Sequence, residues 1–106
     1  MILIGTDSKV YQQVTKYCTC ILDTETGLLQ KHYVSSKTLP RAARLHQEAA
    51  LTLSYSARYP NAELHFDYST NPKHKSYPLY LAYKDAGKFK PEAFMATSVA
   101  DYFLTH

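Results

Sequence analysis

A five-residue turn sequence, DTETG at 23–27, separates two runs of residues that favour β-structure. The run from Val14 to Leu22 is rich in β-forming residues and roughly alternates between apolar and polar positions. The run from Leu28 to Ser36 follows the turn, and Gly27 can adopt the positive φ that a tight turn requires. The pattern therefore predicts an antiparallel hairpin, which excludes an all-helical fold.

One strand precedes this hairpin, and helices alternate with strands after it. Residues 2–6, ILIGT, form a short apolar run that is typical of a central strand covered on both faces. The later elements are a helix from about Pro40 to Ala57, a strand at 62–67, a short helix from about Tyr77 to Ala86, a stub of strand at 88–90, and a helix from Pro91 nearly to His106. This order predicts an α/β fold. Its mixed five-stranded sheet has three antiparallel strands, then parallel additions, with a short last strand and flanking helices.

The composition is that of a globular protein with one core. The 106 residues predict a single domain, 1–106, and 45% apolar with 20% charged residues is ordinary for a soluble protein. No apolar run approaches the ~18 residues of a membrane span, so we expect no membrane partner. The N-terminal segment lacks the basic region and cleavage site of a secretory signal, which predicts a cytoplasmic protein.

Four carboxylates fall one apiece on four successive predicted elements: Asp7, Glu48, Asp67 and Asp101. Acids at strand ends and on inward helix faces are costly to bury unless something neutralises them. Oxygen ligands from separate elements are what Mg²⁺ or Mn²⁺ prefers, so we predict that all four acids are metal ligands and catalytic residues. Each acid alone has a simpler explanation as a turn cap, an Asx-turn or a surface charge. The four together favour one shared site.

Polar residues near two of these acids bear on the same site. Thr97 and Ser98 precede Asp101 by four and three residues, which places them on one helix face where a metal or water could approach. His65 shares the strand face of Asp67, either as a support for the metal ligands or as a structural histidine.

A basic segment between residues 68 and 90 suggests what the site acts on. It contains five lysines and one acid, Asp85: Lys73, Lys75, Lys84, Lys88 and Lys90. Basic residues next to an acidic pocket suit a polyanion, so we predict nucleic acid of undefined type as the partner. Lys73 and Lys75 would hold phosphates, and His74 would contact phosphate or assist proton transfer. A solvated lysine face is the alternative for any single lysine.

Cys18 and Cys20 form a C-x-C pair on one face of a predicted strand. Two thiols cannot complete a structural zinc site, and the sequence contains no second pair. We interpret them as small buried hydrophobic residues.

Three segments resemble a known family: IGTDSKV, HFDYSTNPKHKS and KPEAFMATSVADYF. They are similar to the YkuK-type predicted ribonuclease-H-like nucleases, and the order of elements resembles the ribonuclease H fold. The resemblance implies hydrolysis of phosphodiester bonds in RNA, DNA or a hybrid by a two-metal mechanism. It also implies that Asp7 bridges the two metals. The alternatives are a catalytically silent nucleic-acid-binding or assembly domain with the same fold, and a structural homo-oligomer that uses the tyrosine-rich surfaces.

Overall fold

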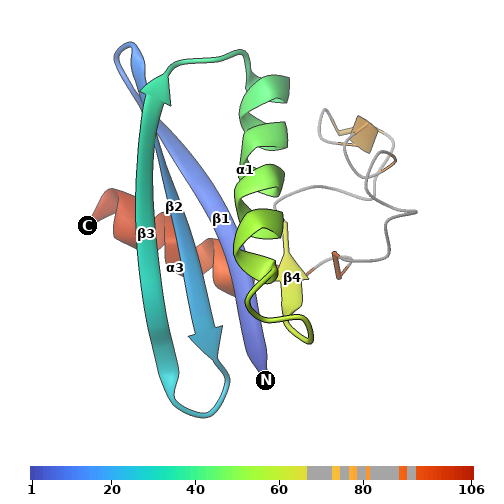
Figure 1. The fold of residues 1–106 in the computed structure, drawn as a ribbon. Helices are drawn as coiled ribbons and strands as arrows, with labels where there is room; N and C mark the ends of the chain where they lie inside the picture. Colours follow the sequence, from blue (N-terminus) through green and yellow to red (C-terminus); the bar gives the residue numbers. More distant parts are fainter. Residues whose placement is uncertain (67–72, 75–76, 79–80, 82–88, 91–92) are drawn as a thin grey trace.

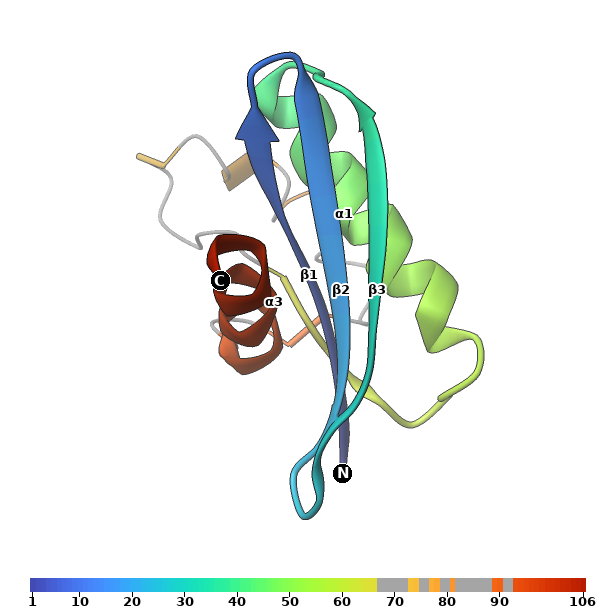
Figure 2. The ribbon, with the colours of Figure 1, turned by 90° about the vertical axis from the view of Figure 1, so that its left-hand side faces the viewer.

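The computed structural model describes residues 1–66, 73–74, 77–78, 81, 89–90 and 93–106. It contains a four-stranded sheet with one helix on each face (Figures 1 and 2). The elements are β1 (Ile2–Tyr11), β2 (Val14–Asp23), β3 (Gly27–Lys37), α1 (Arg41–Ser56), β4 (Glu63–His65) and α3 (Met95–Thr105). In Figure 2 the sheet is seen nearly edge-on, with α1 and α3 on opposite sides of it.

The sheet has the strand order β3-β2-β1-β4. β1, β2 and β3 are antiparallel neighbours, and Gly27 at the β2–β3 turn has a φ of 93°, which confirms the predicted hairpin. β4 pairs parallel with β1, with His65 opposite Gly5 in the last pair. β1 therefore lies in the middle of the sheet, as its apolar sequence predicts. It is also longer than predicted, because its pairing with β2 continues to Tyr11.

The prediction of a fifth strand, and with it a five-stranded ribonuclease-H-like sheet, is wrong. Residue 89 makes only an isolated parallel bridge, in which Phe89 pairs with Leu64. The sequence continues with a proline at position 91, which has no N–H to donate to a longer ladder. Phe89 packs in the core, where the centroid of its ring lies 5.4 Å from the centroid of the Phe66 ring.

The bounds of α1 match the prediction more closely than those of α3. α1 matches the predicted helix within a residue at each end. α3 begins at Met95 because Phe94 has a non-helical φ of −128°, whereas the prediction started the helix at Pro91. Pro91 and most of the predicted helix at 77–86 lie outside the described residues. Among the described residues, no helix is long and apolar enough to span a membrane.

Successive β1 side chains contribute to two separate cores, since neighbours on a strand point to opposite faces. The α1 side buries Ile4, Ile21, Leu45, Ala49, Leu64, Phe66 and Phe89. The α3 side buries Leu3, Cys18, Cys20, Leu22, Ala96, Ala100 and Leu104. The two thiols are fully buried with their sulfurs 3.9 Å apart, which agrees with their interpretation as core residues.

A chain of buried hydroxyls ties α1 to the sheet. Thr52 donates a 2.8 Å hydrogen bond to Thr6, whose oxygen lies 2.7 Å from that of Thr19. All three side chains are buried, so each hydroxyl finds its partner within the chain itself. This chain fixes α1 above the middle of β1 and thereby places Glu48, one turn earlier in α1.

Candidate functional site

Asp7 and Asp101 meet in one pocket on the α3 side of the sheet. The pocket has a volume of about 330 Å³ and is lined by Asp7, Phe94, Thr97, Ser98 and Asp101. Asp7 lies in the middle of β1 because that strand continues beyond it, and Asp101 projects from α3. Thr97, Ser98 and Asp101 share one face of α3, as their spacing predicts, and this face lines the pocket together with Asp7.

Local hydrogen bonds orient the groups around this pocket. The Asp7 carboxylate accepts a 2.9 Å bond from the backbone N–H of Ser8. The Thr97 hydroxyl donates to the Phe94 carbonyl at 3.0 Å, which leaves its oxygen lone pairs available. The pocket therefore offers two carboxylates and two hydroxyls, all hard oxygen donors.

Glu48 lies on the opposite face of the sheet from Asp7. It is buried beneath α1, and its Oε2 accepts a 2.6 Å hydrogen bond from the Ser8 hydroxyl. Ser8 and Asp7 are adjacent on β1 and so point to opposite faces. Burial, and to a smaller extent the Glu48 charge, raises the pKa of Tyr17, which pairs with Ser8 across the β1–β2 ladder. The contact between Ser8 and Glu48 was not predicted, because it joins residues 40 positions apart and has no local signal in the sequence.

The structure describes only some of the remaining predicted site residues. Lys73 and His74 are solvent-exposed, whereas Asp67 and Lys75 lie outside the described residues. Within the described part of the chain, no three His, Cys, Asp or Glu side chains are grouped so as to hold a metal ion. The structure therefore brings two of the four predicted acids together and separates Glu48 from them by the thickness of the sheet. The roles of Asp67 and the basic loop stay predictions.

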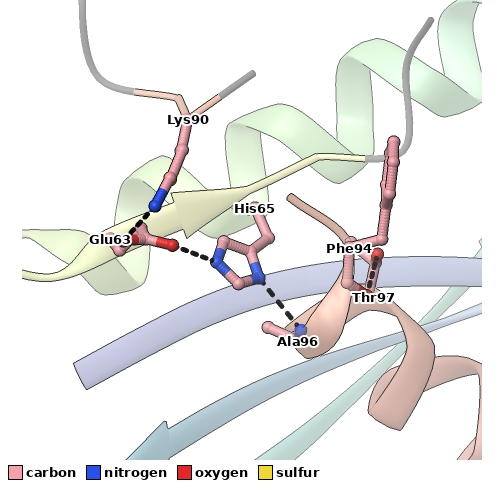
Figure 3. A network of polar contacts seen from close by, with 6 residues as sticks. All are labelled: Glu63, His65, Lys90, Phe94, Ala96 and Thr97. Atoms are coloured by element: carbon pink, nitrogen blue, oxygen red, sulfur yellow. Dashed lines mark hydrogen bonds and ion pairs between the residues drawn. The ribbon is translucent and has the colours of Figure 1, made fainter. Parts of the chain in front are cut away.

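His65 connects β4 to the first turn of α3, as Figure 3 shows. Its Nδ1 accepts a 3.0 Å hydrogen bond from the backbone N–H of Ala96, and its Nε2 lies 2.8 Å from Glu63 Oε1. A ring nitrogen that accepts from an N–H carries no proton, so His65 is the tautomer that donates from Nε2. Phe94, at the helix N-cap, provides no side-chain cap. His65 supplies that missing acceptor from another element and so holds the pocket-lining helix in place.

Glu63 links this network to solvent, and its pKa predicts a pH dependence. The hydrogen bond from His65, with a further contribution from Lys90, lowers the pKa of Glu63 below its ordinary 4.5. A carboxylate with a lowered folded-state pKa stabilises the fold above its unfolded-state pKa, and this contribution is lost as the pH falls through the folded-state value. We expect the free energy of unfolding to fall more steeply with acidification below 4.5 in the wild type than in Glu63→Gln. Urea titrations at a series of pH values measure this. Equal slopes would contradict it.

Comparison of the chain with protein-family models, with curated proteins and with solved structures finds no match. The assignment of function therefore depends on the site itself.

Proposed function

We propose that this protein is a divalent-metal-dependent nuclease that hydrolyses phosphodiester bonds. The observation that supports the proposal best is the pairing of Asp7 with Asp101. Residues from the first strand and the last described helix contribute carboxylates to the same small, polar pocket. Two carboxylates facing one pocket repel each other, and a cation between them would remove that cost.

The donor set fits Mg²⁺ or Mn²⁺. Magnesium keeps several waters and is typically held by one or two carboxylates together with substrate phosphates, so a complete protein cage is not required. Asp7 and Asp101 would be the ligands of one such ion, and the Thr97 and Ser98 hydroxyls would bind its waters. A second ion would need a further ligand, for which Asp67 is the predicted candidate. A bound ion would polarise the phosphoryl group and favour ionisation of a water nucleophile.

The chain's own residues would fix the geometry of this reaction. The Ser8 N–H orients the Asp7 carboxylate, and His65 fixes the start of the helix that carries Asp101. In this proposal Lys73, His74 and Lys75 contact the phosphates of the substrate. The resemblance of three segments to the YkuK-type family is consistent with this activity.

The test combines metal binding with cleavage. Millimolar Mn²⁺ or Mg²⁺ should raise the melting temperature of the wild type, because an ion that binds only the native state stabilises it. The same ions should support cleavage of at least one of three labelled substrates: single-stranded RNA, single-stranded DNA or an RNA–DNA hybrid. Asp7→Asn and Asp101→Asn should each lose most of the metal-induced thermal shift and reduce cleavage by roughly 100-fold or more, about 2.7 kcal/mol of transition-state stabilisation.

Glu25→Gln provides the control, since Glu25 is an exposed acid in the β2–β3 turn. It removes one negative charge far from the pocket and should change neither readout. A metal response that persists in both pocket variants would mean that the ions bind elsewhere. A thermal shift without cleavage of any substrate would favour a catalytically silent metal-binding domain.

A further inference from the structure

Two stretches in the first half of the chain contain basic residues but no acidic ones. Residues 8–22 and 27–47 carry six Lys or Arg residues and no Asp or Glu. The chain as a whole is far more balanced, with 12 basic and 9 acidic residues. The three acids between residues 2 and 47 are Asp7 and, beside the β2–β3 turn, Asp23 and Glu25, so the rest of β1, β2, β3 and the start of α1 carries only basic charges.

Part of this charge lies on the α3 side of the sheet, interleaved with aromatic rings. We call this group the lysine–aromatic strip; its members are Lys9, Tyr11, Lys16, Lys31, Tyr33 and Phe103. The β1–β2–β3 register places the five strand residues on the same face as Asp7, and Phe103 joins them from α3. Tyr11 and Tyr33 are 45% and 41% exposed, so part of each side chain can be reached from solvent.

The cations and rings of the strip are held against one another. Lys16 Nζ lies 4.4 Å from the centroid of Tyr33, and Lys31 Nζ lies 4.2 Å from that of Phe103. Lys9 Nζ lies 5.9 Å from the centroid of the Tyr11 ring. The Tyr11 hydroxyl donates a hydrogen bond to the Leu104 carbonyl, which fixes the ring. These contacts fix flat aromatic surfaces beside ammonium groups, which is the combination that binds bases and phosphates of single-stranded nucleic acid.

The strip begins next to the carboxylate pocket. Lys9 follows Asp7 by two residues on the same face, a step of ~6.6 Å along a strand. Cys18 lies opposite Asp7, and Tyr33 lies opposite Cys18, which places Tyr33 two strand spacings, or ~10 Å, from Asp7. Because α3 packs over Cys18, a nucleic-acid strand that joins the strip to the pocket would pass over Lys9 and its cross-strand neighbour Lys16 rather than directly over Cys18.

We propose that the lysine–aromatic strip binds single-stranded nucleic acid. Its lysines contact phosphates, and Tyr33, with Tyr11, stacks on bases. That the bound nucleic acid continues into the Asp7–Asp101 pocket rests on the proposed nuclease function, but its binding to the strip does not. A duplex keeps its bases stacked inside and offers no free base faces to these rings, so single strands should bind more tightly.

Fluorescence anisotropy in EDTA tests the binding without cleavage. The probe is a fluorescein-labelled oligo(dT) of about 12 nucleotides, within the usual size range of aromatic-lined single-strand sites, compared with a duplex of the same length. The duplex should bind more weakly than the single strand. Tyr33→Leu should weaken single-strand binding about fivefold or more, the lower limit for losing one base stack, while Tyr33→Phe should retain it.

The charge contribution is tested with a matched pair of double variants. Lys16→Ala/Lys31→Ala should reduce the slope of log K against log salt concentration by about 1.4, because each phosphate of a single strand that a lysine neutralises contributes ~0.7 to that slope. Arg41→Ala/Arg58→Ala removes the same charge from exposed positions at the two ends of α1, outside the strip, and should leave the slope unchanged. Circular dichroism verifies that every variant is folded.

Several outcomes would overturn the proposal. Equal loss of binding in the two double variants would mean that only the overall charge matters. Equal binding of Tyr33→Leu and the wild type, or of duplex and single strand, would exclude base stacking on the strip. Binding to phosphatidylserine vesicles but not to the oligonucleotide would identify an anionic membrane as the partner. Asp7→Asn should retain oligonucleotide binding, so loss of cleavage with retained binding would separate a failure of the nuclease site from a failure of the strip.

Discussion

Substituting Gly5 should destabilise the protein by separating α3 from the sheet. A Cβ on Gly5 would lie 2.8 Å from Ala96 Cβ and 2.8 Å from the Thr97 backbone nitrogen. Two of the three nearest atoms belong to the helix backbone, which cannot rotate away as a side-chain end can. Overpacking of this kind typically costs ~1–3 kcal/mol, so we expect a loss in this range for Gly5→Ala and a larger one for Gly5→Val. Urea denaturation measures both losses.

The same substitutions should also affect the pocket, because Thr97, Ser98 and Asp101 move with α3. We expect Gly5→Ala to reduce the Mn²⁺-induced thermal shift as well as the stability of the metal-free protein. Ser35→Val, which adds bulk at an exposed β3 position, should stay within about 0.5 kcal/mol of the wild type. A Gly5→Ala variant of wild-type stability would show that the contact between β1 and α3 is looser than these distances imply.

Replacing His65 with phenylalanine should have the second large effect. Phenylalanine keeps a ring of similar shape at this buried position but cannot accept the Ala96 N–H or donate to Glu63. Leaving the buried N–H of Ala96 without its partner costs ~1–3 kcal/mol, and the loss of the Glu63 bond adds to it. We expect a total loss of about 2–4 kcal/mol in the free energy of unfolding.

Amide hydrogen exchange distinguishes this mechanism from general loss of packing. Exchange at Ala96 and the first turn of α3 should accelerate more than exchange at the core amides of β2, because the helix start loses its cap. His65→Gln, which retains a side-chain acceptor, should recover part of the protection. Uniform acceleration across the chain would contradict a specific role for the His65–Ala96 bond.

The parts of this fold that follow local rules could be predicted from the sequence. A turn sequence between two β-rich runs specified the hairpin, and helical spacing after Pro40 specified α1 almost to the residue. The predicted fifth strand had only residues 88–90 to support it, and no local signal showed that the pairing of Phe89 would stay an isolated bridge. Pairing with β2 as far as Tyr11 is a long-range effect that the apolar run at 2–6 could not reveal.

In the candidate site, too, local features could be predicted from the sequence and long-range ones could not. Thr97, Ser98 and Asp101 lie on one face of α3 because of helical periodicity, which the sequence shows directly. Glu48 is different, since its position three residues after Leu45 correctly indicates that it points inward but not which face of the sheet α1 covers. That choice depends on how the chain crosses from β3 to β4. This crossing places Glu48 and Asp7 on opposite faces of the sheet, although Glu48 contacts Ser8, the residue next to Asp7 on β1.

The position of α3 over Cys18 and Cys20 has a consequence for the order of folding. The bond between Tyr11 and Leu104 joins residues 93 positions apart, so docking α3 must close one of the longest loops in the chain. Non-local contacts of this kind form late, and until then the α3 side of the hairpin exposes its apolar residues. The two thiols are among them, yet they are fully buried in the native fold. Oxidants can therefore reach this pair only while α3 is detached, so the oxidation rate of the thiols depends on how often the helix opens as well as on the reactivity of the sulfur atoms.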